Sequence, residues 1–459
     1  MVTRELTCFF TAIFAFVLLL CSTTEQIPKK RYKGIDRTLN LLNSSSEEHP
    51  NSIEILFYGQ SIIGGMKTNI LVDSLKQRFP FANISFKHKP IGGFTVPDLS
   101  RTIAHDVYQE NPDLIIFHAY GGIKDGLYDL LVKNIRERMS SDILLLDHHC
   151  VWNTPASKLE SINKSHDFDS KAIEVIAKKY DCGFVNVREQ WKTYLEINQI
   201  GPNELMGNSI DPNVHPNDKG NELLRNIVLS KFPKSKVPST FNVYADSLRK
   251  ITPLKKENAH FKTKQHPGTV LELFVDNKNT NKAVIEVLID ARKPSEFKSS
   301  YHIERPSKGY KNWMPGISRV SFGKTFPREE DWTISLFDID RENKKFKFKL
   351  EGSLTGFDGQ GNNEDLFISD SNRISLDGND FNVFRIETIS KSQTPENFQI
   401  NFRINQIARD TLTVYPEKNK YLIFRTQDSL QKPIQLEVKL IKGEVSYKQL
   451  VMSRPYLKN

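Results

Sequence analysis

The chain of 459 residues is longer than one hydrophobic core usually supports, so we expect at least two domains. Hydrophobic residues make up 38% of the sequence and charged residues 26%, which excludes an intrinsically disordered chain. The formal net charge of +9 is spread over several short basic stretches. Such a surface suits acidic glycans or nucleic acid, but solvated lysines explain it more simply. No nucleic-acid motif and no zinc-type cysteine spacing occurs, so we expect no nucleic-acid partner.

Residues 1–22 have the pattern of a secretory signal. Arg4 precedes an apolar stretch from Cys8 to Cys21, which suits a signal peptide and is short for a membrane span. Cys21 hints at a lipoprotein signal, although Leu20 before it is larger than lipidation usually requires. An uncleaved anchor is the third alternative. We expect a secreted, periplasmic or cell-surface protein, with membrane attachment through the N-terminus left open, and a solvated linker over residues 23–48.

Residues 49–237 alternate between apolar strands and amphipathic helices, which is typical of a parallel sheet covered on both faces. The predicted strands are SIEILFYG, NISFKHKP, DLIIFHAY, DILLLDHH and GFVNV. The predicted helices are TNILVDSLKQRF, GLYDLLVKNIRERM, SKAIEVIAKKY and KGNELLRNIVLSKF.

Residues 238–459 show short alternating strands broken by Asn, Asp, Gly and Pro, which predicts one antiparallel β-sandwich or two small ones. The predicted strands are TVLELFVD, KAVIEVLID, WTISLFDID, KFKFKLEG, FNVFRIETI, FQINFRIN and IQLEVKLI. This region would be an accessory domain.

Cys150 and Cys182 are the cysteines that remain after the signal segment. Cys150 closes one predicted strand and Cys182 opens the next. Parallel neighbours would place them at opposite ends of the sheet, beyond bridging distance. We therefore expect two buried thiols and no disulfide.

Small and polar residues follow the predicted strands at the edge where functional groups gather in such sheets. Ser61 follows the first strand in Gly59-Gln60-Ser61, and Gly92 and Gly93 follow the second. The third and fourth strands are followed by Tyr120-Gly121-Gly122 and by His148-His149.

A serine nucleophile needs a base and an orienting partner for that base. Asp211 and His215 supply both types in SIDPNVHPN, a polar loop before the closing helix. Alone, an Asp and a His four residues apart more often form local hydrogen bonds in a loop or cap a helix. Its position nevertheless allows His215 to reach the edge that carries Ser61.

With these residues in place, positions 52–232 resemble the SGNH, or GDSL-like, hydrolase superfamily, in particular its exported carbohydrate esterases. Gly59-Gln60-Ser61 corresponds to the family's Gly-Asp-Ser, KPIGGFTVPDL to its second block, and Asp211 with His215 to its last. The resemblance implies a flavodoxin-like parallel sheet with helices on both faces, a Ser61–His215–Asp211 arrangement, and no cofactor. It also implies that the amides of Ser61 and of Gly93 (or Gly92) stabilise the oxyanion.

Two departures from the family pattern stand out. The family spaces its last pair as Asp-x-x-His, whereas DPNVH has one more residue, so a backbone carbonyl is an alternative partner for His215. The family's third block carries an Asn that donates to the oxyanion, and FHAYGGIKDG has none. Backbone amides of Gly121 or Gly122 are the substitutes, and Gln60 would hold the turn or a substrate hydroxyl.

His118, His148 and His149 near the same edge suggest a metal site, but no carboxylate or cysteine joins them at ligand spacing, so we expect no metal. Asp358, Asn362 and Asp365 are spaced like calcium ligands but lack the bidentate Glu, which favours turns. Trp313 and Trp332 are candidates for stacking on sugar rings, with core packing expected for at least one of them.

The resemblance implies an exported serine esterase that removes ester groups, most simply O-acetyl groups, from a polysaccharide or oligosaccharide. A lipase or acyltransferase of the same superfamily is the first alternative. A non-catalytic glycan-binding protein is the second, because the third and last blocks are altered.

Overall fold

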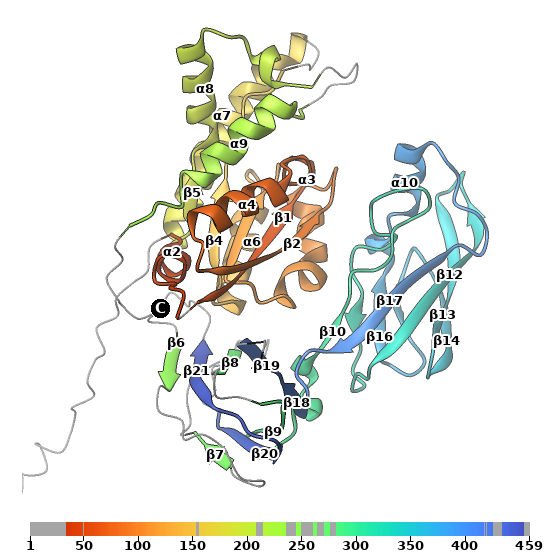
Figure 1. Cartoon of the computed structure of the whole chain (residues 1–459). Coiled ribbons are helices and arrows are strands. Elements are labelled where there is room, and N and C mark those ends of the chain that lie inside the picture. The colour runs from red at the N-terminus through yellow and green to blue at the C-terminus, as the bar shows by residue number, and fades with distance from the viewer. Residues whose placement is uncertain are drawn as a thin grey trace, which may run out of the picture. The chain divides into compact units, whose positions relative to one another are not determined.

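The computed structural model describes residues 34–48, 50–152, 156–207, 214–235, 245–248, 260–263, 270–275, 281–416, 418, 420–425 and 434–453 (Figure 1). The expected signal segment and Asp211 lie outside these residues. Within the described part of the chain, no helix is both long enough and apolar enough to cross a bilayer.

The first domain is built on a five-stranded parallel sheet of order β2-β1-β3-β4-β5. This order places β1 between its two neighbours and is the flavodoxin-like arrangement expected from the resemblance. Its strands are β1 Ser52–Gly59, β2 Asn83–Pro90, β3 Leu114–His118, β4 Asp142–Leu146 and β5 Gly183–Val185.

Helices cover both faces of this sheet, as predicted (Figure 1). Alternate residues of β1 point to opposite faces: Ile55 and Phe57 enter one core, whereas Leu56 and Tyr58 enter the other. One face carries α2 Asp36–Asn43, α3 Ser61–Gly65, α4 Thr68–Arg78, α8 Val187–Asn198 and α9 Asp218–Leu229. The other carries α5 Val96–Ile103, η1 Ala104–Tyr108, α6 Leu127–Arg138 and α7 Ala156–Lys179. A short turn, η2 Pro202–Leu205, precedes α9.

Helix α2 corrects the prediction that residues 23–48 form a solvated linker. Leu42 of this helix is buried in the core on one face of the sheet. The backbone amide and hydroxyl of Thr38 both donate to Asp142 Oδ2 at 2.8 Å. The polar composition therefore concealed a short amphipathic helix that packs on the sheet.

The described residues after position 238 form two pairs of antiparallel sheets, which corresponds to the second of the two predicted alternatives. In the first pair the orders are β18-β9-β20-β7 and β19-β8-β21-β6, and both sheets share one core. The strands are β6 Ala245–Leu248, β7 His260–Lys262, β8 Val270–Val275, β9 Ala283–Ile289, β18 Thr411–Val414, β19 Lys420–Arg425, β20 Leu436–Lys442 and β21 Tyr447–Ser453.

The second sandwich is inserted into the first. It lies between β9 and β18, which pair directly with each other. Its sheets have the orders β10-β17-β12-β13-β14 and β11-β16-β15. Its elements are η4 Pro294–Glu296, η5 Lys298–Ser300, β10 Tyr301–Ile303, β11 Ser321–Phe322, β12 Glu330–Asp340, β13 Lys345–Gly352, β14 Gly356–Asn362, β15 Leu366–Ile368, β16 Ile374–Asp377, η6 Gly378–Asp380, α10 Val383–Ser390 and β17 Gln399–Gln406.

Helix α10 replaces the strand predicted for FNVFRIETI. Its β-branched residues favoured a strand, but Val383 and Ile386, three positions apart, share one buried helical face. Val383 packs in the inserted sandwich, and Ile386 packs in the core of the α/β domain. Tertiary packing therefore decides the conformation of this segment.

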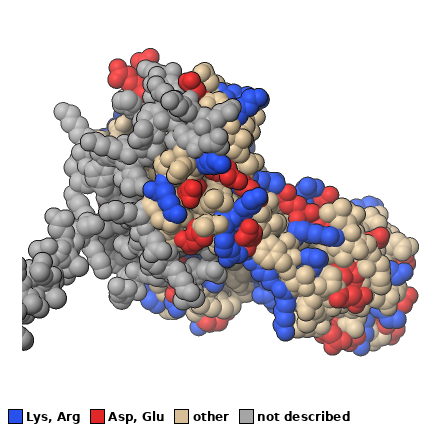
Figure 2. Space-filling model, turned by 90° about the horizontal axis from the view of Figure 1, so that it is seen from below, with Lys and Arg blue, Asp and Glu red and all other residues tan. Residues whose placement is uncertain are grey.

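Charges of both signs are mixed on the surface. On the face that Figure 2 displays, Lys and Arg side chains lie among Asp and Glu side chains. Among the described residues, charged side chains also form ion pairs, such as Arg403 with Asp331 at 2.9 Å and Lys67 with Asp218 at 2.8 Å. The distribution agrees with a solvated surface.

Candidate active site

Ser61 lies at a tight strand-to-helix turn. Strand β1 ends at Gly59, Gln60 is extended, and Ser61 is the first residue of α3. The Gln60 amide donates to the carbonyl of His118 at 3.2 Å, and the Gln60 carbonyl accepts from Gly64 at 3.0 Å. These bonds fix the turn at the carboxyl end of β1 and leave Ser61 partly exposed.

The loop after β2 runs beside this turn. The amide of Ile91 donates to the carbonyl of Gly59 at 2.9 Å, and Pro90 pairs with Gly59 in the sheet. The loop therefore starts beside Gly59, which precedes Ser61 by two residues. Gly93 has a φ of +79°, a left-handed conformation that favours glycine. Further on, the amide of Val96 donates to the carbonyl of Tyr120 at 3.0 Å, which joins this loop to the one after β3. Gly121 and Gly122 follow Tyr120 directly.

The loop that carries His215 lies beside helix α3. Asn221 of α9 donates to the carbonyl of Pro216 at 3.0 Å, and a Cβ atom on Gly65 would lie 3.9 Å from the Asn221 side chain. Since α3 begins at Ser61, the structure brings the loop that carries His215 and the turn that carries Ser61 to the same edge of the sheet. Partial desolvation lowers the pKa of His215, although its side chain is largely exposed, so the ring is neutral near pH 7 and able to accept a proton.

The structure thus gathers five of the seven predicted site residues into loops at this edge: Ser61, Gly93, Gly121, Gly122 and His215. Gln60 is the sixth; its side chain is buried, and the side-chain nitrogen Nε2 has no hydrogen-bond partner among the described residues. Asp211 lies outside the described residues. The pairing of Ser61 with His215 stays a prediction.

A cluster of buried rings lies at the ends of β3 and β4. His148 Nδ1 lies 3.1 Å from His118 Nε2, and the ring centroid of Tyr120 lies 4.3 Å from that of His148 and 4.9 Å from that of His166 on α7. Burial lowers the pKa of His118 to about 3 and that of His166 to about 4, so both rings are neutral at pH 7. Sequence reasoning missed His166 because it lies inside a long helix with no motif around it.

His149 does not join this pair. Its Nε2 lies 2.8 Å from the carbonyl oxygen of Val214, which can only accept, so Nε2 carries the proton. The ring therefore supports the loop that carries His215. Among the described residues, no group of three or more His, Cys, Asp or Glu side chains has an arrangement that fits a metal ion.

A buried carboxylate and a buried guanidinium hold the loop after β4. Asp147 accepts from the amides of Val187 and Arg188 at the start of α8, and burial raises its pKa to about 6. The Arg188 side chain donates to the carbonyl of His149 at 2.9 Å. These contacts fix the backbone that presents His148 and His149.

Asp358 and Asn362, which are spaced like calcium ligands in the sequence, take part in turns, as expected. Asn362 Oδ1 accepts from the amides of Glu364 and Asp365, which is an Asx turn. Asp358 is buried and accepts from the amide and hydroxyl of Ser371. These oxygens therefore satisfy backbone groups of neighbouring turns.

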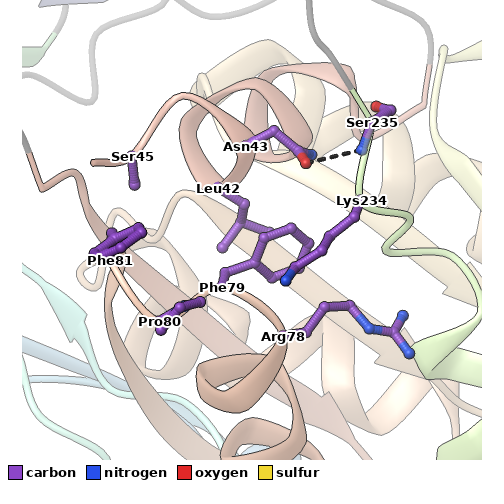
Figure 3. Close-up of a pocket in the computed structure, with 9 residues that line it drawn as sticks. All are labelled: Leu42, Asn43, Ser45, Arg78, Phe79, Pro80, Phe81, Lys234 and Ser235. Carbon is purple, nitrogen blue, oxygen red and sulfur yellow. Dashed lines mark hydrogen bonds between the residues drawn. The ribbon is translucent and has the colours of Figure 1, made fainter. Parts of the chain in front are cut away.

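A cavity of about 390 Å³ lies away from this edge (Figure 3). It is lined by residues that precede β1 and β2, at the amino end of the sheet, together with Lys234 and Ser235. Figure 3 shows Asn43 and Ser235, which are joined by a hydrogen bond of 3.0 Å, on one side of the cavity, and Phe81 near Ser45 on the other. Its position opposite Ser61 separates it from the candidate active site.

No known protein-family profile matches the chain, and no curated protein sequence does. Solved structures similar to it include the acetylxylan esterase Axe2 of Geobacillus stearothermophilus, with 19% identity over 42% of this chain and 100% of that one, and a TM-score of 0.35. They also include LAE5, an α/β hydrolase enzyme from the metagenome of Lake Arreo, with 18% identity over 41% of this chain and 98% of that one, and a TM-score of 0.34. At these identities and scores the likeness assigns no activity or residue role to this chain, and the fold rests on the strand order described above.

Proposed function

We propose that the protein is an exported serine esterase that removes acyl groups, in particular O-acetyl groups, from carbohydrate. The observation that carries this proposal is the position of Ser61 at a strand-to-helix turn, with the Gly93 loop and the His215 loop at the same edge of the sheet. A nucleophile, a base and an amide donor are the three parts that acyl transfer needs.

The chemistry follows from these parts. His215 takes the proton of Ser61 while Oγ attacks the ester carbonyl, and the oxyanion accepts from the amides of Ser61 and Gly93. Collapse expels the sugar alkoxide, which receives the proton from His215. Water, deprotonated by the same ring, then attacks the acyl-serine. His215 returns this proton to Ser61 Oγ as the carboxylic acid leaves. Gly121 and Gly122 are the candidates for a third backbone donor, because the chain has no Asn at that position.

A carbohydrate substrate is supported by Trp313. Its side chain is 52% exposed, and its indole lies against Gly92 in the loop after β2. An exposed aromatic face beside the reaction centre suits stacking on a sugar ring. Trp332 is 1% exposed and stacks on Phe402, so it belongs to the core.

The proposal is tested by measuring acetate release from a panel of acetylated glycans and from 4-nitrophenyl acetate. Ser61→Ala and His215→Ala should each lower kcat by about 10³-fold or more, and the double variant should be scarcely worse, because such residues act as a unit. Ser74→Ala is the matched control, since Ser74 on α4 is partly exposed like Ser61 and its hydroxyl donates to the carbonyl of Ile70 in its own helix. Activity retained by Ser61→Ala would overturn the proposal.

The two alternatives give different results in the same assay. A lipase would prefer long acyl chains, and an acyltransferase would produce an acylated glycan rather than free acetate. A non-catalytic glycan-binding protein would bind the glycans without turning over either ester. Export is tested separately: mass spectrometry of the released protein should show that residues 1–22 are missing, and a soluble species that retains Met1 would contradict it.

A further inference from the structure

Side chains of the inserted sandwich hold the Gly92–Gly93 loop. The indole Nε1 of Trp313 donates to the carbonyl of Gly92 at 2.9 Å. The Arg385 guanidinium donates to the carbonyl of Gly93 at 2.7 Å. Both consecutive carbonyls of the loop are therefore occupied by donors from a segment more than 200 positions away in the sequence.

The Arg385 side chain is itself fixed by the α/β domain. Its Nη1 lies 2.8 Å from Asp98 Oδ1, and its guanidinium carbon lies 4.9 Å from the ring centroid of Phe94. Asp98 in turn accepts from the amide of Thr95 and completes the capping box of α5. Asp98 and Phe94 thus orient the guanidinium that donates to Gly93.

Close packing adds to these hydrogen bonds. Met314 and Ile386 are fully buried in the core of the α/β domain. A Cβ atom on Gly93 would lie 2.9 Å from Met314 Cε, and one on Gly92 would lie 3.1 Å from Trp313 Nε1. The loop is therefore in direct contact with side chains of the inserted sandwich.

The Gly92 carbonyl and the Gly93 amide belong to the same peptide unit. A trans peptide is planar, so its C=O and N–H point in opposite directions, and no cis peptide occurs among the described residues. A donor that fixes the direction of the Gly92 carbonyl therefore also fixes the direction of the Gly93 N–H. The same hydrogen bond polarises the peptide and strengthens that N–H as a donor.

We propose that Trp313 is a positioning residue for the oxyanion donor, with Arg385 as its partner on the following carbonyl. The inserted sandwich then completes the active site, in addition to any role in glycan binding. This inference rests on the proposed function, in which the Gly93 amide stabilises the oxyanion.

Trp313→Phe separates positioning from sugar stacking. Phenylalanine keeps an aromatic face but loses the N–H that holds Gly92. With 4-nitrophenyl acetate, which has no sugar, kcat should fall about 10- to 100-fold, since misplacing an oxyanion donor costs part of the about 10²–10³-fold lost on its removal. KM should change less than about threefold, because 4-nitrophenyl acetate has no sugar ring to stack on the indole and phenylalanine keeps an aromatic face. Phe357→Leu, at an exposed aromatic residue of β14, is the control and should leave kcat unchanged.

Arg385→Gln gives an independent test, with Arg403→Gln as control. Both arginines are partly exposed and form an ion pair with an Asp. Arg403, however, lies on β17, and its partner is Asp331 rather than a residue of the Gly92–Gly93 loop. Asp98→Asn removes the charge of the ion pair and leaves the bond from Arg385 to Gly93. Arg385→Gln should lower kcat more than Asp98→Asn does, because Asp98 reaches Gly93 only through Arg385. Circular dichroism and thermal unfolding establish that each variant is folded.

The outcomes distinguish this inference from the proposed function. A folded wild-type protein without Ser61-dependent esterase activity would overturn the proposed function, and this inference with it. An active wild type whose Trp313→Phe and Arg385→Gln variants keep kcat within twofold would overturn the inference alone. Equal losses in Arg385→Gln and Asp98→Asn would also overturn it, since they would assign the effect to the ion pair.

Discussion

A Cβ atom on Gly59 would lie 2.0 Å from the carbonyl oxygen of His118. The two residues are paired in the sheet, and the turn that presents Ser61 begins directly after Gly59. Gly59 also has a φ of +142°, which side chains of L-residues rarely adopt. Close approach and backbone conformation therefore both require glycine at this position.

We predict that Gly59→Ala lowers the free energy of unfolding by about 3 kcal/mol or more, since the overlap is with backbone that cannot rotate away. Urea unfolding followed by circular dichroism measures the change. Gly126→Ala is the control: its φ is also positive, but a Cβ there meets nothing within 4 Å. That variant should lose only about 1–2 kcal/mol, the cost of the left-handed conformation. Equal losses would show that steric overlap with His118 is unimportant.

Local patterns were sufficient to predict the parallel sheet and its helices. The predicted strands SIEILFYG and NISFKHKP match the bounds of β1 and β2. The central strand β1 is mostly apolar because helices cover both of its faces, whereas β2 lies at the edge of the sheet and is more polar. The edge where Ser61, Gly93 and His215 gather was also predictable, since all carboxyl ends of parallel strands meet there. Helix α2 and helix α10 were not, because their conformation depends on the surfaces against which they pack.

The contacts from the inserted sandwich to Gly92 and Gly93 could not be predicted from the sequence. Trp313 and Arg385 lie in segments with no motif, and their role depends on a tertiary contact across 200 or more positions. His166 was missed for a similar reason: a histidine inside an amphipathic helix gives no sign of which rings it will meet. Long-range contacts of single side chains leave no periodic signal in the chain.

The buried histidines should make folding stability depend on pH. Burial lowers the pKa of His118 to about 3, so that between this value and the ordinary value near 6.5 the unfolded chain binds a proton that the folded chain does not. The neutral His118 ring contributes fully to the free energy of unfolding above pH 6.5, and this contribution is lost progressively as the pH falls toward 3. His149 and His166, whose pKa values are lowered to about 3 and about 4, act in the same direction. Asp147, whose pKa is raised to about 6, acts in the opposite direction between its ordinary value and 6.

We predict that His118→Gln makes the free energy of unfolding less dependent on pH. At pH values well below 6.5 and above 3, the slope should fall by roughly 1.4 kcal/mol per pH unit, the contribution of one proton. Urea unfolding at several pH values between 7 and 4.5 measures it. Ile116→Val, at a buried residue of the same strand, should lower stability at every pH and leave the slope unchanged. An unchanged slope in His118→Gln would contradict burial as a neutral ring.

Cys150 and Cys182 should both remain thiols in the purified protein. Both are buried and unpaired, and burial raises the pKa of each. Cys182 lies next to Gly183, which pairs with Leu144 in the sheet, whereas Cys150 follows the other end of β4. Alkylation in denaturant without a reductant, followed by peptide mapping, should label both residues. Alkylation without denaturant should be slow at both, and a peptide linked through the two cysteines would contradict the strand register.

The two tryptophans that sequence reasoning grouped together should separate in stability. Trp332 is 1% exposed in the core of the inserted sandwich, with its ring centroid 6.3 Å from that of Phe402, whereas Trp313 is 52% exposed. Trp332→Ala should lower the free energy of unfolding by about 3–5 kcal/mol through lost burial and the cavity left behind. Trp313→Ala should lower it by about 1 kcal/mol or less, because half of its surface already faces solvent.

In glycan binding the order should be reversed: loss of Trp313 should have the larger effect and loss of packing at Trp332 the smaller. Titration of each folded variant with an acetylated oligosaccharide should show a weaker Kd for Trp313→Ala, which loses the exposed ring beside Gly92. Phe402→Leu, which removes the ring that stacks on Trp332 and keeps an apolar side chain, should leave the Kd unchanged while it lowers stability. If Trp313→Ala bound the glycan as well as the wild type did, the exposed indole would act only on the Gly92 carbonyl, and the sugar would be recognised by other residues at the edge of the sheet.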